Sequence, residues 1–331
     1  MLRNVTAAAA ALLVSTALAN AAEIAPAVVF DMGGKFDKSF NEGVYNGVER
    51  FKKETGIEYR EFEVTNETQR EQALRRMAQR GADPVIGVGF AQAPAMEKVA
   101  KEFPDTRFAI IDAVVDLPNV RSIVFKEHEG SFLVGMIAAM KSESGKVGFI
   151  GGMDIPLIRK FACGYEQGAK HVSSDIEVVQ NMTGTTPSAW NDPTRGSELA
   201  QSQFDRGVDV IYAAAGGTGV GVYQTAADSG KFAIGVDSNQ NYLHPGTMLT
   251  SMLKRVDVAA YKAFKDAHDG TWTSGIQNLG LAEDGVGWAL DEHNKDLITE
   301  EMKAKVEQAA ADIVAGKLTV HDYTADNSCS Y

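Results

Sequence analysis

The chain has 331 residues, a length typical of about two domains. Hydrophobic residues make up 44% of it and charged residues 23%, which is the balance of a folded globular protein and excludes general disorder. The formal net charge is −12 and no basic run is present, so nucleic acids and anionic membrane surfaces are poor partners. Two cysteines are too few for a disulfide scaffold or a four-thiolate zinc site, and six scattered histidines show no spacing typical of a catalytic metal.

The first residues have the pattern of a secretory signal peptide. Arg3 precedes a nearly continuous apolar run over 5–19, and Ala19-Asn20-Ala21 follows as an A-x-A cleavage site. The run is shorter than the roughly 20 residues that a membrane-spanning helix needs. We therefore expect a signal peptide over 1–21 and an exported mature chain in an oxidising compartment such as a periplasm. No lipobox cysteine precedes the cleavage site.

Strand-like apolar runs alternate with helix-like segments along the rest of the chain. Strands are predicted over 25–31, 57–64, 84–89, 107–112, 120–125, 146–151, 176–181, 209–214, 232–237 and 248–254. Helices are predicted over 41–55, 68–80, 93–102, 130–141, 157–172, 193–206, 219–229, 257–268 and 299–315. The pattern begins again after Phe125, and no Pro- or Gly-rich linker separates the halves. This alternation predicts two α/β lobes with parallel sheets, joined by strand-like crossovers.

Polar or glycine residues follow several of the predicted strands where each one ends. These residues are Asp31, Asp112, the Gly216–Gly219 turn, Asp237 and Lys254. Ligands of parallel sheets bind at the carboxyl ends of the strands. One acid alone is more often a turn or cap residue, but the set together predicts a ligand site.

The sequence offers little support for an enzyme. No GxSxG motif is present, and Ser39 has no histidine nearby in its loop. Glu127 and Glu129 flank His128 in a predicted crossover, where a solvated or hinge-lining charge cluster is the favoured interpretation. The glycines of 216–221 do not form a complete phosphate-binding motif, so backbone contacts to a neutral polar ligand are favoured there.

Two aromatic residues lie on loops near strand ends. Phe36 follows Asp31 in the first loop, and Trp190 lies among Ser, Asn, Asp and Pro residues before a helix. A phenylalanine is usually a core side chain, and a tryptophan in such a loop is either exposed or in contact with a ligand. If the two rings come from different lobes, they can enclose a flat ligand.

At these residues the sequence resembles the Bmp/PnrA family of periplasmic solute-binding proteins of ABC transporters. The resemblance extends from about Ala25 to Thr319. Its motifs are Asp37-Lys-Ser-Phe-Asn41, Phe125 with Glu129-Gly-Ser-Phe132, Gly151-Gly-Met153, Asn191-Asp-Pro193, Gly235-Val-Asp237 and Thr250-Ser-Met-Leu-Lys-Arg-Val-Asp257. The chain departs from the family in lacking a lipobox cysteine, in Ser238-Asn239-Gln240, and in Trp190, where the family often has Phe.

The resemblance implies a type I periplasmic-binding fold of two Rossmann-like lobes joined by three crossovers. We place these crossovers near 125–129, 252–254 and 273–276. The first lobe would then comprise 22–126 plus 253–275, and the second 127–252 plus 276–331. Cys163 and Cys329 fall in the same lobe, and in an oxidising compartment a disulfide between them is favoured over a reactive thiol.

The resemblance also implies a nucleoside bound in the cleft between the lobes. Phe36 and Trp190 would stack on the base, and Asp112, with Asp31, would accept its N–H groups. Asn41, Asp237 and Lys254 would hold the ribose hydroxyls, and Gly216 and Gly217 would offer backbone groups. A carboxylate facing a base suits the donors of guanine, so a purine nucleoside is favoured.

The partners that the resemblance implies are the small-molecule ligand and an inner-membrane permease, with no cofactor, no metal and a monomeric receptor. A flavin with its ribityl chain remains an alternative ligand. A nucleoside-processing enzyme and a sensory receptor remain alternative functions.

Overall fold

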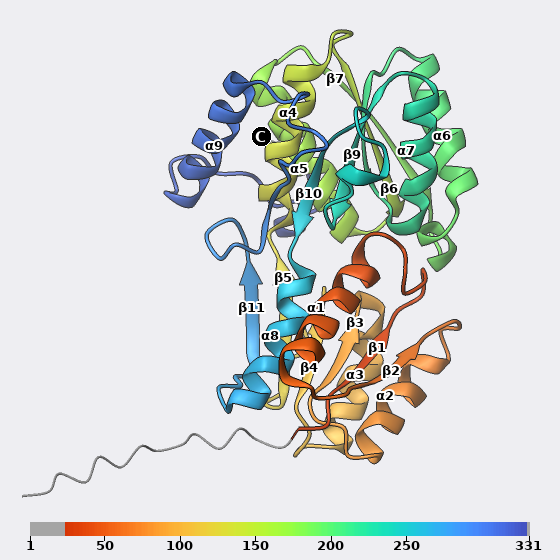
Figure 1. Ribbon diagram of the computed structural model, residues 1–331, viewed down its shortest axis with the longest axis vertical. Helices are drawn as coiled ribbons and strands as arrows, with labels where there is room; N and C mark the ends of the chain where they lie inside the picture. Colours follow the sequence, from red (N-terminus) through yellow and green to blue (C-terminus); the bar gives the residue numbers. More distant parts are fainter. Residues whose placement is uncertain (1–23, 330–331) are drawn as a thin grey trace, which may run out of the picture.

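The computed structural model describes residues 24–329, so the predicted signal peptide lies outside the described residues. The chain forms two α/β lobes stacked along the long axis of the molecule (Figure 1). No helix of residues 24–329 combines the length and apolar character needed to cross a membrane.

The first lobe is built on a six-stranded sheet in which every pair is parallel. Its strands, in spatial order, are β11 (Gly275–Leu279), β5 (Val120–Phe125), β4 (Phe108–Ile111), β3 (Val85–Val88), β1 (Ala27–Phe30) and β2 (Arg60–Glu63). Its helices are α1 (Phe40–Thr55), α2 (Gln69–Gln79), η1 (Phe90–Gln92), α3 (Ala93–Glu102) and α8 (Val256–Asp269). Alternate side chains of β1 point to opposite faces of the sheet. Val28 and Phe30 pack in the hydrophobic cluster that contains α1 and α8. Ala27 and Val29 pack in the cluster that contains α2 and α3.

The second lobe has a six-stranded sheet of the same kind. Its order is β12 (Val286–Trp288), β10 (Met248–Lys254), β9 (Phe232–Asp237), β8 (Val210–Ala214), β6 (Lys146–Met153) and β7 (Glu177–Gly184), and β12 alone is antiparallel to its neighbour. Its helices are α4 (Glu127–Lys141), α5 (Pro156–Val172), η2 (Pro187–Trp190), α6 (Pro193–Asp205), η3 (Gly216–Thr218), α7 (Gly219–Asp228), η4 (Asn241–Leu243), α9 (Glu300–Val314) and η5 (Tyr323–Ala325). Two α/β lobes with mostly parallel sheets are the architecture that the sequence pattern predicts, and they match the type I periplasmic-binding fold that the family resemblance implies.

Three short segments carry the chain between the lobes. They are Lys126 between β5 and α4, Arg255 between β10 and α8, and residues 280–285 between β11 and β12. Two of them are tied to the third or to the strand before it: Arg255 N donates to Gly285 O over 2.8 Å, and Lys126 N donates over 3.0 Å to O of Leu279, the last residue of β11. The lobes are therefore joined by a compact hinge rather than by independent linkers.

The third crossover lies later in the chain than the sequence indicates. Residues 276–279 were expected in the second lobe, but they belong to β11, which pairs with β5 in the first sheet. This strand is short and largely exposed at the sheet edge, so it carries no apolar run that marks it in the sequence.

Cys163 and Cys329 form a disulfide, with their Cα atoms 5.6 Å apart. Gln167 and His321 support the same attachment, because the Gln167 amide donates to His321 O over 2.9 Å and accepts from His321 N over 2.8 Å. The C-terminal segment is thereby fixed along α5 in the second lobe.

Candidate functional site

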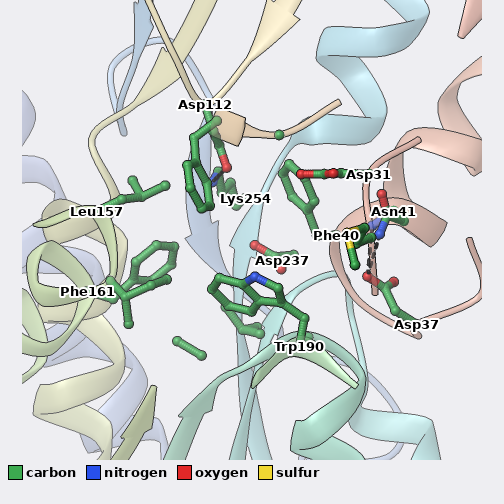
Figure 2. A pocket seen from close by; sticks show the side chains of 17 residues that line it. Asp31, Asp37, Phe40, Asn41, Asp112, Leu157, Phe161, Trp190, Asp237 and Lys254 are labelled. Atoms are coloured by element: carbon green, nitrogen blue, oxygen red, sulfur yellow. Dashed lines mark hydrogen bonds and ion pairs between the residues drawn. The ribbon is translucent and has the colours of Figure 1, made fainter. Parts of the chain in front are cut away.

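A cavity lies between the two lobes, at the carboxyl ends of strands from both sheets. Figure 2 shows the side chains of the 17 residues that line it. The first lobe contributes Asp31, Met32, Asp37, Phe40, Asn41, Gly89, Phe90 and Asp112. The second lobe and the hinge contribute Leu157, Ile158, Phe161, Trp190, Ala214, Gly216, Val236, Asp237 and Lys254.

Seven of the nine ligand-binding residues predicted from the sequence line this cavity. They are Asp31, Asn41, Asp112, Trp190, Gly216, Asp237 and Lys254. Gly217 is buried but is not one of the residues that line the cavity. A Cβ atom on it would lie 3.3 Å from the carbonyl oxygen of Trp190.

Phe36 is not in the cavity. The residue is 58% exposed, and its ring packs edge-on against Tyr45 with the ring centroids 5.1 Å apart. Phe40, at the start of α1, occupies the position that was assigned to Phe36. Residues 37–39 make the turn into the helix and direct Phe40 towards the cleft. Its place within the Asp37–Asn41 motif, directly before the predicted helix, was the available signal.

Asp37 holds the start of α1 in place. Its carboxylate accepts the backbone N–H groups of Ser39 over 2.9 Å, Asn41 over 3.0 Å and Glu42 over 3.1 Å. These donors favour the ionised carboxylate, but burial outweighs them and raises the pKa of Asp37 to about 7. Asp37 therefore orients Phe40 and Asn41 by fixing the helix that carries them.

Hydrogen bonds join the lobes directly at one side of the cavity. Ser39 Oγ donates to Asp237 Oδ2 over 2.6 Å, and Ser238 Oγ donates to Ser39 O over 2.8 Å. Gln240 Nε2 donates to Lys38 O over 3.0 Å. One carboxylate oxygen of Asp237 is thus engaged across the cleft, in a structure whose lobes are in contact.

Lys254 is the centre of a buried charge network. Its ammonium lies 2.6 Å from Asp112 Oδ2 and 3.2 Å from Glu127 Oε1, and its side chain is 2% exposed. Lys160 Nζ lies 2.8 Å from the other oxygen of Glu127 and donates to Phe125 O over 3.0 Å. Glu127 is therefore a buried member of an ion network at the hinge, not a solvated charge.

The charges of this network shift one another's pKa values. Burial raises the pKa of Asp112 to about 6, although the neighbouring Lys254 lowers it. Burial by itself lowers the pKa of Lys254, but the carboxylates of Asp112, Glu127 and Asp237 more than offset this and leave it raised. Lys254 is accordingly a permanent cation in the site.

Two of the aspartates that line the cavity have an unusual backbone conformation. Asp112 has φ = 71° and Asp237 has φ = 62°, in the left-handed region that few non-glycine residues adopt. Such a conformation costs on the order of 1–3 kcal/mol and tends to occur at binding sites. It lets each strand end turn its carboxyl group towards the cavity.

Two buried acceptor atoms in the cavity have no hydrogen-bond partner in the protein. Asp112 Oδ1 and Asn41 Oδ1 are buried without a hydrogen bond. Buried acceptors without partners are costly, so these atoms are suited to receive N–H or O–H donors from a ligand.

Aromatic side chains supply the apolar part of the cavity. Phe40 comes from the first lobe, and Trp190 and Phe161 come from the second. Figure 2 shows Leu157 and Phe161 across the cavity from Asp31 and Asn41, with Trp190 and Asp237 between them. The site can therefore bind a molecule that has both a flat apolar part and several hydrogen-bond donors.

Among residues 24–329, one cluster of side chains has the spacing of metal ligands: Asp291, Glu292 and His293. It does not line the cavity. Asp291 in it already accepts hydrogen bonds from Asn239 and Asn241.

Residues 24–322 match the family model of the PnrA-like ABC transporter substrate-binding proteins, Bmp. The ABC transporter nucleoside-binding protein BmpA of Lactococcus lactis is 32% identical over 321 residues, covering 90% of this chain and 89% of that protein. An uncharacterized lipoprotein of Pyrococcus abyssi is 37% identical over 288 residues, covering 82% of this chain and 70% of the other.

Solved structures of ABC transporter solute-binding proteins also resemble this chain. An ABC transporter solute-binding protein from Aeropyrum pernix superposes with a TM-score of 0.83 at 30% identity, covering 91% of this chain and 94% of that one. A solute-binding protein from Conexibacter woesei, with a TM-score of 0.73 and 21% identity, shares the fold. Members of the matched family are solute-binding receptors rather than enzymes. With a match over nearly all of the described residues, this chain belongs to the PnrA-like (Bmp) family of ABC transporter substrate-binding proteins.

Proposed function

We propose that this protein binds a nucleoside, preferably a purine nucleoside, in the interlobe cavity and presents it to the permease of an ABC importer. As a member of its family, it takes a small-molecule ligand and works outside the cytoplasmic membrane with a membrane permease. The nucleoside, the periplasmic location and the cleaved signal peptide are our proposals.

One observation carries the choice of ligand. Aromatic rings from both lobes lie beside buried acceptor atoms that no protein group satisfies, namely Asp112 Oδ1 and Asn41 Oδ1. A nucleoside combines a flat base with a sugar that carries hydroxyl groups. The base suits the faces of Phe40 and Trp190, and its N–H groups suit the free oxygens.

The ribose fits the part of the cavity lined by Asp237 and Lys254, next to Asp112. Asp237 can accept two hydroxyl protons, and the Lys254 ammonium can donate to a hydroxyl oxygen. Asp237 has one carboxylate oxygen on Ser39, which leaves the other available to a ligand. The name of the Lactococcus lactis relative, a nucleoside-binding protein, supports the same ligand class.

A flavin is the second candidate because it also joins a flat ring system to a chain of hydroxyl groups. The aromatic and acidic lining would serve both ligands. Ring size separates them, since an isoalloxazine has three fused rings and a purine has two.

Native mass spectrometry of the mature protein, followed by denaturation and identification of any released molecule, tests this function. We expect one chain per particle and a released purine nucleoside. Isothermal titration of the emptied protein with guanosine, adenosine, uridine and riboflavin should give micromolar or tighter binding for a purine nucleoside, about −8 kcal/mol. Release of a flavin would show that the ligand is a flavin and not a nucleoside. An empty protein that no nucleoside binds or stabilises thermally would overturn the proposal.

A further inference from the structure

Gly152 lies in β6 directly against the indole of Trp190. An ideal Cβ atom built on Gly152 would lie 2.8 Å from Cη2 of that ring and closer still to Cζ3 and Cε3. Carbon atoms in favourable contact are about 3.5–4.0 Å apart. Any side chain larger than a hydrogen at this position must therefore displace the ring.

The backbone itself does not require glycine here. Gly152 is not among the residues with positive φ, and it lies inside a regular strand between two residues that pair with β7. An L-residue can adopt this extended conformation. The missing side chain thus serves the contact with Trp190 rather than a turn or a strained conformation.

Other glycines bound the same side chain. A Cβ atom on Gly33 of the first lobe would lie 3.4 Å from Trp190 Cβ, and one on Gly216 would lie 3.9 Å from Cε3 of the Trp190 ring. Backbone surfaces cannot change rotamer, so they define the place of the ring more firmly than flexible side chains would.

We propose that Gly152 is a positioning residue that sets the tilt of the Trp190 ring, and through it determines which flat ligands the cavity accepts. The effect on ligand selection rests on the proposed function, whereas the effect on the position of the ring does not. A methyl group at position 152 pushes the indole towards the ligand space and spoils its stacking on a base.

A double-mutant cycle with guanosine as the probe tests the proposal. Wild type, Gly152→Ala, Trp190→Ala and the double variant are titrated calorimetrically. We expect Gly152→Ala to weaken binding at least about tenfold, and to have no effect beyond about twofold in the Trp190→Ala background. Near-wild-type binding by Gly152→Ala, or an equal loss in both backgrounds, would overturn the proposal.

Gly287→Ala is the matched control. Gly287 also lies in a strand, β12, but a Cβ atom on it would have no neighbour within 4 Å. This variant should bind guanosine as wild type does. A loss equal to that of Gly152→Ala would indicate a general effect of glycine replacement and would contradict the proposal.

Fluorine NMR of protein labelled with 5-fluorotryptophan tests the geometry without a ligand. The chain has three tryptophans, and the Trp190 resonance is assigned with Trp190→Phe. Gly152→Ala should shift that resonance and leave those of Trp272 and Trp288 in place. An unshifted Trp190 resonance would overturn the positioning role. A shifted resonance in a protein that binds no nucleoside would uphold it while overturning the proposed function.

Discussion

At the scale of single residues, the cavity carboxylates differ in how their charge is balanced. Asp112 has the ammonium of Lys254 at 2.6 Å, and Asp31 has the guanidinium of Arg70 at 3.0 Å. Asp237 has the hydroxyl of Ser39 as its direct side-chain partner, without a cation within 4 Å among the described residues. Asp237 is therefore the carboxylate that gains most from ligand hydroxyl groups.

Replacing Asp237 with alanine should abolish nucleoside binding. A hydrogen bond to a charged group contributes about 1.5–3 kcal/mol, so losing two of them weakens binding by roughly 100-fold or more. Isothermal titration with guanosine measures the loss. Ser39→Ala is the control, because it removes the cross-cleft partner of Asp237 and keeps its carboxylate. An Asp237→Ala protein that binds as tightly as wild type would contradict the assigned role.

Replacing Lys254 with methionine should destabilise the fold as well as the site. It leaves the carboxylates of Asp112 and Glu127 buried without this cation, and breaking a buried ion pair costs about 3–5 kcal/mol. Urea denaturation measures the change, and adding Asp112→Asn should restore part of it. Lys52→Met, at an exposed ion pair with Glu58, should have little effect. Equal stability of the two methionine variants would argue against a buried network.

The sequence identifies these carboxylates because parallel sheets place strand ends together, and Asp31, Asp112 and Asp237 each follow a strand. It does not reveal their partners. Lys254 was expected on ribose hydroxyls, yet its ammonium contacts two carboxylates, one of them Glu127. Such pairings depend on how the two lobes meet, and local sequence patterns carry no information about that.

At the scale of elements, the differences between prediction and structure lie at helix starts and at the sheet edge. The predicted helix over 130–141 begins at Glu127, because Lys160 and Lys254 compensate the buried Glu127 charge and allow the helix to start at the hinge. The helix predicted over 68–80 begins at Gln69, and the Thr68 hydroxyl donates to Asn66 Oδ1 instead of capping the helix. The long strand and helix interiors follow their apolar periodicity and match closely.

The disulfide should stabilise the second lobe without affecting the ligand. It joins residues 166 positions apart and fixes the C-terminal segment to α5, and neither cysteine lines the cavity. Replacing both cysteines with serine should lower the free energy of unfolding by about 2–5 kcal/mol. Guanosine affinity should stay within about twofold of wild type, since the disulfide is remote from the cavity. A large loss of affinity would show that the C-terminal segment supports the site.

At the scale of the whole molecule, the charge balance selects against anionic ligands. Four carboxylates line the cavity with one ammonium, and that ammonium already contacts Asp112 and Glu127. The chain as a whole carries a formal net charge of −12. A phosphate group would bring further negative charge into a buried acidic site, where repulsion is weakly screened.

We therefore expect guanosine 5′-monophosphate to bind at least about 100-fold more weakly than guanosine, because like charges in a buried site cost several kcal/mol. Isothermal titration of both compounds at equal ionic strength measures the ratio. Deoxyguanosine is the control: it is neutral like guanosine but lacks one hydroxyl group, so its affinity shows how much binding is lost with one hydrogen-bonding group. Comparable affinity for the nucleotide and the nucleoside would require a cationic site elsewhere in the cleft.

The same carboxylates make stability and binding respond to pH in opposite directions. Burial raises the pKa of Asp37 to about 7 and that of Asp112 to about 6, above the ordinary aspartate value of 3.8. The folded chain therefore holds protons that the unfolded chain releases. The free energy of unfolding should fall as pH rises from about 4 to about 7, at roughly 1.4 kcal/mol per unit of pKa shift.

Binding should show the reverse trend, because a ligand N–H forms a stronger hydrogen bond to an ionised Asp112 than to a protonated one. Guanosine affinity should fall as pH drops below about 6, and Asp112→Asn should remove most of that dependence. Urea denaturation and titration calorimetry over the same pH series measure the two trends. Burial lowers the pKa of His128, which opposes the stability trend, so the difference between wild type and Asp37→Asn isolates the aspartate contribution. Stability that fell as the pH was lowered would contradict the raised pKa values of these carboxylates, and an affinity that stayed constant below about pH 6 would show that Asp112 does not control binding through its proton.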